Sequence, residues 1–214
     1  MAIITTLNYS PNFNPKKRKN NQIKFLIFHY TGMKTEKAAI ERLTDIKSKV
    51  SSHYLIKQNG EIITLVPDLY TAWHAGKSVW KNYKHLNKDS IGIEISNPGH
   101  GINYKNFSKV QLTSLIGLSK FLIKKYKIDS KNILWHSDIA PERKNDPGEK
   151  FPWKLLSKKK IGYWHNLNQK KLIKSRNLKT SNKEKNLFLY NLFKIGYQKK
   201  FFHSSDYNQI NFNN

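Results

Sequence analysis

A chain of 214 residues with 38% hydrophobic and 13% aromatic residues is long enough to bury a core, which argues against an intrinsically disordered protein. It contains no cysteine, so disulfides, cysteine-ligated zinc and thiol nucleophiles are excluded. The net charge of +25 attracts polyanions of any kind, and a solvated surface rich in lysine and asparagine explains this charge equally well.

The N-terminal residues carry no convincing targeting signal. No run approaches the roughly 20 apolar residues that a membrane span needs, so we expect no transmembrane segment. The apolar stretch at the start is short and is followed by a basic cluster over residues 16–19, unlike a signal peptide. We therefore expect a cytoplasmic protein, or a periplasmic one if a leader has been trimmed from the sequence. We also expect a monomer rather than an oligomer.

The first predicted elements are a strand, a helix and a hairpin. Residues 24–30 (KFLIFHY) form an almost continuous apolar run, which predicts a strand buried on both faces. Residues 35–47 carry apolar side chains at helical spacing behind Thr35, a residue suited to cap a helix. Two β-rich runs then flank Asn59-Gly60, the pair that favours a type I′ hairpin turn.

Two further strands and a long helix follow. Residues 90–96 (SIGIEIS) alternate, so their isoleucines face one side and Glu94 faces the other. A lone carboxylate in mid-strand is unusual, because burial and β-propensity both disfavour it. Residues 108–126 carry a capping box and a broad apolar stripe, which predict a helix, and residues 132–136 (NILWH) predict a buried strand that ends at a histidine.

The composition changes near residue 154. Residues 151–214 hold 14 Lys/Arg against 2 Asp/Glu, a net charge of +12 on less than a third of the chain. Residues 186–197 (NLFLYNLFKIGY) predict an amphipathic helix ended by glycine. We expect an α/β fold with a mixed central sheet flanked by helices, with an N-terminal extension over 1–23, the main domain over 24–165 and a basic helical extension over 166–214.

Two histidines and an aspartate are the clearest candidates for chemistry. His29 and His136 each end an apolar strand, where sites gather in open sheets, and Asp146 follows 10 residues after the second histidine. Two imidazoles and one carboxylate form a ligand set that holds Zn²⁺ and leaves its fourth position open, as in zinc hydrolases. On spacing alone, a metal site and two structural histidines explain the pattern equally well.

The segment HSDIAPERKNDPGEKFPW (136–153) resembles the type 2 N-acetylmuramoyl-L-alanine amidases, the AmpD/AmiD-like family related to phage amidase lysozymes and animal peptidoglycan-recognition proteins. Five further segments occur in the family's order: SPNFN (10–14), FHYTG (28–32), VSSHYLI (50–56), LVPDLYTAWHAG (65–76) and DSIGIEISNPGH (89–100). The resemblance covers about residues 10–165, is most pronounced to the bacterial AmiD-like branch, and implies the peptidoglycan-recognition type of fold.

This resemblance implies an activity and its residues. It implies Zn²⁺ held by His29, His136 and Asp146, in an enzyme of peptidoglycan catabolism. Such an enzyme hydrolyses the amide bond between N-acetylmuramic acid, or its 1,6-anhydro form, and L-alanine in peptidoglycan or muropeptides. Glu94 matches the family's catalytic carboxylate, and Lys144 matches the lysine proposed to stabilise the oxyanion.

One departure and four supporting residues complete the predicted site. Ser52 stands where phage and animal amidases carry a catalytic tyrosine, which places more of the expected chemistry on Glu94. We expect the supporting residues to bind substrate: His74 and His53 along the groove, Asn97 and Arg143 on muropeptide carboxylates. Each of the two histidines is equally well explained as a structural residue.

Two other functions stay open at this point. A peptidoglycan-binding module without catalysis keeps the same groove, although the presence of all five metal and catalytic residues favours the enzyme. Nucleic-acid binding rests on charge alone, without a recognition motif, so we expect no specific nucleic-acid partner. The extension over 166–214 is either a shortened peptidoglycan-binding module or a helix that docks on the core.

Overall fold

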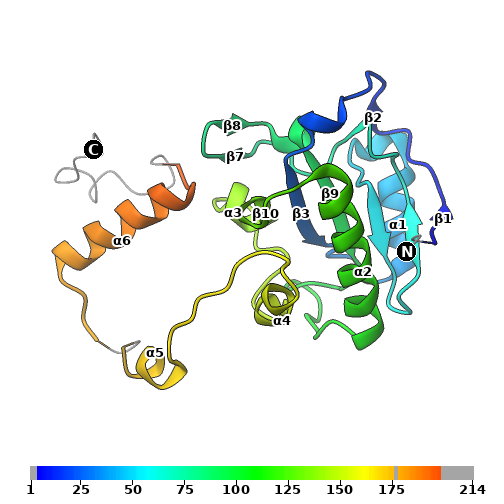
Figure 1. Cartoon of the computed structure of the whole chain (residues 1–214). Coiled ribbons are helices and arrows are strands. Elements are labelled where there is room, and N and C mark those ends of the chain that lie inside the picture. The colour runs from blue at the N-terminus through cyan, green and yellow to red at the C-terminus, as the bar shows by residue number, and fades with distance from the viewer. Residues whose placement is uncertain (1–3, 176–177, 199–214) are drawn as a thin grey trace.

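A mixed six-stranded sheet forms the centre of the computed structural model, which describes residues 4–175 and 178–198 (Figure 1). In spatial order its strands are β1 (Thr6–Leu7), β5 (Ile62–Thr64), β4 (Tyr54–Ile56), β9 (Ser90–Ile95), β3 (Phe25–Tyr30) and β10 (Ile133–Trp135). The β4–β5 pair is antiparallel and the other four pairs are parallel. The predicted mixed α/β sheet is confirmed.

Helix α2 (Lys109–Tyr126) covers one face of this sheet. Its predicted capping box is present, with the Ser108 hydroxyl accepting from the backbone N–H of Gln111 and the Gln111 side chain accepting from the N–H of Ser108. The apolar stripe of the helix then packs on the strands, and the buried residues that meet there include Leu115, Leu118 and Leu122 of α2, Leu26 and Phe28 of β3, and Ile91, Ile93 and Ile95 of β9.

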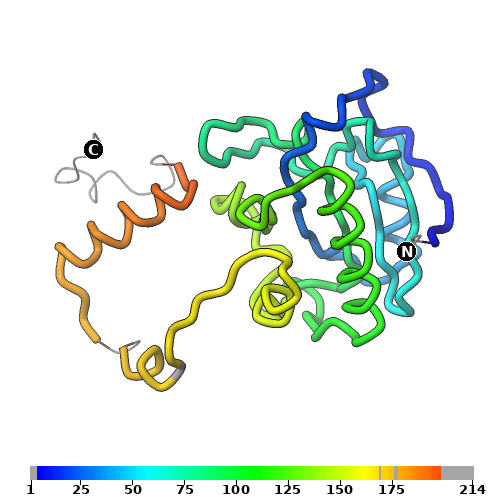
Figure 2. The backbone as a smooth tube through the Cα atoms, viewed as in Figure 1, coloured from blue at the N-terminus to red at the C-terminus, as the bar shows by residue number. Residues whose placement is uncertain are grey.

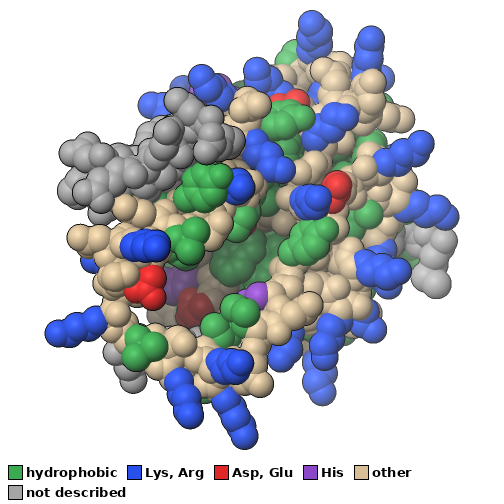
Figure 3. All heavy atoms as spheres, turned by 60° about the vertical axis from the view of Figure 1, so that its left-hand side comes forward, with side chains coloured by type: hydrophobic (Ala, Val, Ile, Leu, Met, Phe, Trp, Pro, Cys, Tyr) green, Lys and Arg blue, Asp and Glu red, His purple; other side chains and the backbone are tan. Residues whose placement is uncertain are grey.

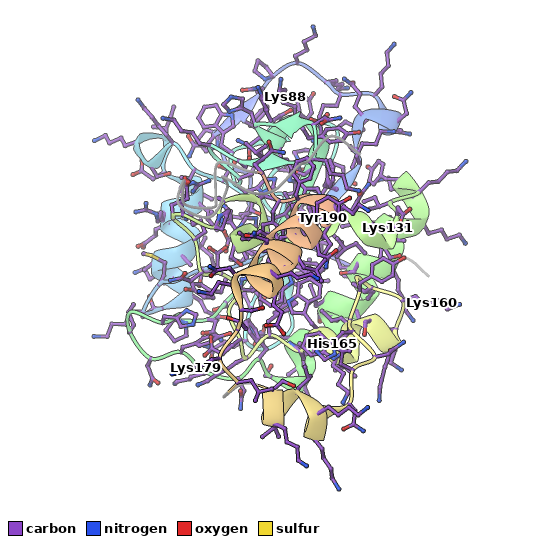
Figure 4. All side chains as sticks on the ribbon, turned by 90° about the vertical axis from the view of Figure 1, so that its left-hand side faces the viewer. Lys88, Lys131, Lys160, His165, Lys179 and Tyr190 are labelled. Carbon is purple, nitrogen blue, oxygen red and sulfur yellow. The ribbon has the colours of Figure 1, made fainter. Side chains whose placement is uncertain are left out.

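Helix α1 (Glu36–Thr44) lies on the opposite side of the sheet, as Figures 1 and 4 both show. The Thr35 side chain caps it, and Leu43 packs against Leu55 and Ile63. Because side chains alternate along a strand, Phe25 and Ile27 of β3 also face this side, and the next residue of that series is His29.

The hairpin between β4 and β5 turns differently from the sequence prediction. The N–H of Gly60 donates to the carbonyl of Lys57 at 3.0 Å, so Gln58 and Asn59 occupy the central positions. Gly60 has φ +85° whereas Asn59 has a negative φ, and a type I′ turn needs positive φ at both central residues. The predicted type I′ turn at Asn59-Gly60 is therefore wrong, and Gly60 instead supplies the left-handed residue that follows the turn.

The N-terminal stretch packs onto the main domain. Strand β1 pairs with β5, and β2 (Phe13–Asn14) pairs with β6 (Thr71–Ala72). The guanidinium of Arg18 is buried and donates to the backbone carbonyls of Asn87, Lys88, Ser90 and Asp68.

The remaining elements are shorter. They are the hairpin strands β7 (Val79–Trp80) and β8 (Tyr83–Lys84), the helices α3 (His136–Ile139), α4 (Trp153–Lys158), α5 (Gln169–Ser175) and α6 (Asn182–Ile195), and four 3₁₀ helices, η1 (Asn20–Gln22), η2 (Ile46–Ser48), η3 (Leu86–Asp89) and η4 (Ser130–Asn132). Among the described residues, none of the helices has the length and apolar character needed to cross a membrane.

The chain leaves the body of the fold after α4 and carries α5 and α6 on a long trace (Figure 2). It returns at the end of α6, where the carbonyl of Gly196 accepts from the N–H of Lys81 at 2.8 Å. The Tyr197 ring packs edge-on against Trp80, with ring centroids 5.0 Å apart, and its hydroxyl donates to the carboxylate of Asp138. A helical extension was predicted; its residues 199–214 lie outside the described part.

Candidate active site

Three neighbouring parallel strands end at the same edge of the sheet and deliver the central side chains. His29 lies near the end of β3, and His136 begins α3 directly after β10. Glu94 lies opposite His29 in the β9–β3 pairing. Asp146 comes from the following loop, whose backbone is fixed to α3 because the N–H of Ser137 donates to the Asp146 carbonyl at 3.1 Å.

The donor atoms of the two histidines and the aspartate converge. Nδ1 of His29 lies 2.9 Å from Nδ1 of His136, and these atoms lie 3.1 and 3.0 Å from Oδ2 of Asp146. All three residues are buried. Nitrogen and carboxylate oxygen donors gathered in this way fit a divalent transition metal, and three protein ligands are typical of sites that keep a position open.

Electrostatics at this cluster favour a neutral imidazole beside a charged carboxylate. Burial, followed by the nearby His29 ring, lowers the pKa of His136 to about 4. Burial disfavours the charged form of Asp146, but close contact with the imidazoles of His136 and His29 holds the pKa of this carboxyl well below its usual range. These are the protonation states that metal ligands need.

Glu94 carries a carboxylate oxygen without a protein partner. Its Oε2 atom is fully buried and makes no hydrogen bond. Desolvation, followed by repulsion from Asp146, raises the pKa of Glu94 well above its usual value, while the charge of Lys144 acts in the opposite direction. A raised pKa brings a carboxyl group closer to the range that suits a general acid or base.

A cleft of about 440 Å³ opens over these groups. Figure 3 shows it as a hollow with histidine and acidic side chains inside. Its walls include side chains from α1, from the 73–74 segment and from the loop before Asp146, namely Arg42, Trp73, His74, Arg143 and Lys144. The cleft thus brings Glu94 and Lys144 together with His136 and Asp146, whereas His29 does not line it but lies against both of these candidate ligands.

The four predicted substrate contacts fall into two pairs. His74 and Arg143 line the cleft, although Nη2 of Arg143 already donates to the carbonyls of Ala75 and Lys77 at 2.5 and 2.7 Å. His53 and Asn97 are not among the lining residues. His53 accepts from the N–H of Gly92, and Asn97 donates to the carbonyl of Lys105, so both side chains are engaged in the fold.

Sequence reasoning missed two residues around the site. Arg42 is exposed on α1 and lines the cleft, but its sequence context resembles any helix surface. Ser90 is fully buried and bonds to His74, with Oγ and Nε2 3.1 Å apart. The alternation that sets Glu94 apart from the isoleucines also places Ser90 on its face, so a signal for Ser90 was present.

Comparisons with known proteins agree with this geometry. The family model for N-acetylmuramoyl-L-alanine amidase matches residues 19–149. The N-acetylmuramoyl-L-alanine amidase AmiD of Escherichia coli (strain K12) is 43% identical over 155 residues, which are 67% of this chain and 55% of AmiD. The 1,6-anhydro-N-acetylmuramyl-L-alanine amidase AmpD of the same organism is 40% identical over 105 residues, 49% of this chain and 55% of AmpD.

Solved structures give the same result. The complex of E. coli AmiD with anhydro-N-acetylmuramic acid-L-Ala-D-gamma-Glu-L-Lys has a TM-score of 0.71 at 35% identity, covering 86% of this chain and 76% of AmiD. AmpDh3 from Pseudomonas aeruginosa in complex with anhydromuramic pentapeptide has a TM-score of 0.70 at 30% identity, with the same coverage of 86% and 76%. The chain spans about half of the length of the two curated relatives described above. On the family match and these likenesses, the chain belongs to the type 2 N-acetylmuramoyl-L-alanine amidase family.

Proposed function

We propose that this protein is a zinc-dependent amidase that cleaves the bond between the lactyl group of N-acetylmuramic acid, or its 1,6-anhydro form, and L-alanine of the stem peptide. One observation carries the proposal: three buried donor atoms converge within 4.8 Å of one another at the end of the strand pair that carries Glu94, whose Oε2 has no protein partner. The substrates named for the relatives supply the substrate class.

In this proposal His29, His136 and Asp146 hold the zinc. Bound zinc supplies Lewis-acid polarisation and makes hydroxide available near neutral pH. The three ligands are fixed by strands and by the α3 backbone, so they hold their positions without rearrangement.

Glu94 and Lys144 carry the proton transfer and the charge stabilisation. Glu94 takes a proton from the attacking water and delivers it to the nitrogen of the leaving L-alanine, while the new C–O bond forms and the C–N bond breaks. The ammonium of Lys144, which lines the same cleft, stabilises the negative charge that develops on the carbonyl oxygen.

The substrate is held by the walls of the cleft. Arg42 and Arg143 supply positive charge that can meet the carboxylates of a stem peptide, and Trp73 supplies an aromatic wall. Lysine and arginine side chains are spread over the face of the molecule that Figure 3 shows, so the cations of the cleft belong to a generally basic surface.

We also propose that the extension attaches the enzyme to peptidoglycan. Helix α6 leaves Leu187 and Phe188 exposed at 58% and 61%, and the residues from 151 onward carry a net charge of +12. An L187E/F188E variant is expected to sediment less with purified sacculi than the unchanged chain while hydrolysing soluble muropeptides at the same rate. Equal sedimentation would contradict this attachment.

The amidase proposal is tested by incubating the purified chain with sacculi and with anhydro-muropeptides, followed by mass spectrometry of the products. Release of intact stem peptides that begin with L-alanine is the expected result. Binding to sacculi without release of peptide would contradict the enzyme and favour the recognition module.

A further inference from the structure

Both candidate histidine ligands turn Nδ1 toward the metal site and Nε2 toward the same short segment of the chain. Nε2 of His29 lies 3.0 Å from Nδ1 of His74, and Nε2 of His136 lies 3.3 Å from the carbonyl oxygen of Ala75. Residues 74–75 thus contact the outer nitrogen of each ligand. The proton positions on these rings follow from their partners.

The proton position on His29 is set through His74 by the buried hydroxyl of Ser90. The Ser90 hydroxyl has one proton and donates it to the carbonyl of Leu86 at 2.6 Å. Its oxygen can therefore only accept from Nε2 of His74, which lies 3.1 Å away. A neutral imidazole that donates from Nε2 has a bare Nδ1, so Nδ1 of His74 accepts a hydrogen bond from the Nε2–H of His29. The proton of His29 is then on Nε2, and its Nδ1 has a free lone pair.

For His136 the partner is a backbone carbonyl, which can only accept. Nη2 of Arg143 also lies 3.5 Å from Nε2 of His136. Its two protons already go to the carbonyls of Ala75 and Lys77 at 2.5 and 2.7 Å. Nε2 of His136 must therefore donate to Ala75, and its Nδ1 is bare as well.

With both protons on Nε2, three lone-pair atoms face one another. Nδ1 of His29, Nδ1 of His136 and Oδ2 of Asp146 lie between 2.9 and 3.1 Å apart without a hydrogen atom between them. Such an arrangement is repulsive unless a cation lies among the three atoms. Hydrogen bonding outside the site thus prepares it for a metal ion.

The segment that sets these protons is itself fixed. The side-chain carbonyl of Asn87 accepts from the backbone N–H of His74 at 3.1 Å and of Ala75 at 2.6 Å. Gly92 leaves room for the imidazole, because a Cβ at this position would lie 2.4 Å from Cγ of His74. His74 is only 8% exposed, so its ring is largely enclosed by the fold although it also lines the cleft.

We propose that Ser90 and His74, together with the Ala75 carbonyl, form a hydrogen-bond relay that locks both ligand histidines in the Nε2–H tautomer and thereby sets the zinc affinity of the site. His74 and Ser90 are then positioning residues. This inference rests on the proposed function, because it takes His29, His136 and Asp146 as the zinc ligands. Loss of such outer partners typically weakens metal binding about 10–100-fold.

The test measures zinc affinity by competition with a chromogenic chelator, apart from activity. Ser90→Ala and His74→Phe are expected to weaken zinc binding by about 10–100-fold. His74→Gln keeps one acceptor and one donor on the side chain and is expected to restore most of the affinity. The matched control is Ser119→Ala on α2. Like Ser90, Ser119 is fully buried, but its hydroxyl has no hydrogen-bond partner, so its removal is expected to leave the zinc affinity unchanged.

A second measurement needs no variant. In the zinc-loaded wild-type chain, ¹⁵N NMR of the imidazoles is expected to show protonated Nε2 and metal-bound Nδ1 for both His29 and His136. Either histidine bound through Nε2 would overturn the relay, and so would wild-type zinc affinity in folded Ser90→Ala and His74→Phe variants.

Failure of the proposed function gives a different result. A wild-type chain that binds zinc with the expected tautomers but leaves muropeptides intact would contradict the amidase and support the relay. Normal cleavage together with unchanged zinc affinity in both relay variants would contradict the relay alone. A wild-type chain that binds no zinc would overturn both.

Discussion

Glu94 faces the same side of the sheet as His29, because the parallel pairing of β9 with β3 sets the two residues directly opposite each other. The neighbouring isoleucines of β9 point to the other face and pack beneath α2. The strand therefore buries its apolar half in the core and presents its one carboxylate beside the candidate metal ligands. This register makes Glu94 the strongest candidate for the proton-transferring group.

A Glu94→Gln variant is expected to lose about 10²–10⁴-fold in kcat, since the amide cannot accept and return a proton. Zinc content should stay at the wild-type level, because Glu94 is outside the donor set. Steady-state hydrolysis of anhydro-muropeptide and elemental analysis check the two parts. Glu41→Gln, on the exposed side of α1, is the matched control. Full activity in the Glu94 variant would rule out this base.

Lys144→Met is expected to lower kcat by about 10²–10³-fold, the usual cost of removing one group that stabilises an oxyanion. KM should change little if the ammonium acts mainly in the transition state. Lys154→Met, an exposed lysine of α4, should behave like the wild type. A Lys144 variant that raises KM and keeps kcat would instead show a role in substrate binding.

Acid is expected to destabilise the fold partly through Asp68. Burial alone would raise its pKa, but hydrogen bonds from Tyr126, Tyr54 and Lys125 hold the pKa below its usual value. A carboxyl whose pKa is depressed in the folded state stabilises the fold above its unfolded pKa of about 3.9, and this contribution disappears as the pH falls through the folded pKa.

The measurement compares the wild type with Asp68→Asn by urea unfolding at several pH values. At neutral pH the variant is expected to be less stable by about 1.5–3 kcal/mol, the range for hydrogen bonds to a charged group. This difference should shrink below about pH 4. A difference that stays constant from neutral to acid pH would contradict the role of the charge.

Tyr197 is expected to stabilise the whole domain although it lies beyond α6. Its hydroxyl donates to Asp138, a carboxyl whose pKa is raised by burial and which also accepts from the N–H of Trp135 at 3.0 Å. Tyr197→Phe leaves that carboxyl short of a donor and should cost about 1–3 kcal/mol of unfolding free energy. Tyr163→Phe, at a residue that is 61% exposed, should cost almost nothing. Equal stability of the two variants would show that this anchor is unimportant.

Local sequence patterns predicted the large elements well. The capping box at Ser108 and the apolar stripe that follows it both lie within α2, so the helix can be predicted without knowing any contact to a distant segment. Helix α6 begins at Asn182, earlier than the predicted start at residue 186, and Ser181 and Glu184 form a second capping box that the sequence contains. The hairpin turn differs from the prediction because the register of β4 and β5 sets Gln58 and Asn59 at its centre, and an Asn-Gly pair alone does not fix that register.

Contacts between distant segments were harder to predict. The basic cluster at residues 16–19 has the composition of a solvated charged surface. Arg18 is nevertheless buried and donates to four backbone carbonyls, whose residues lie between 50 and 72 positions further along the chain. His74 meets His29 across 45 residues of sequence, and no local pattern indicates that pairing. The candidate metal and catalytic residues are singled out mainly by the surrounding motifs that resemble a family, because spacing alone explains structural histidines equally well.

The most direct test of the proposed activity is stepwise zinc reconstitution. The chain is stripped with a chelator, titrated with Zn²⁺, and assayed for release of L-alanine-terminated stem peptide from anhydro-muropeptide. We expect cleavage to vanish on stripping and to return in full at one equivalent of zinc, whereas an Asp146→Ala variant should not recover at that ratio. Undiminished cleavage by the zinc-free chain, or full recovery in the Asp146→Ala variant, would contradict a zinc amidase built on His29, His136 and Asp146.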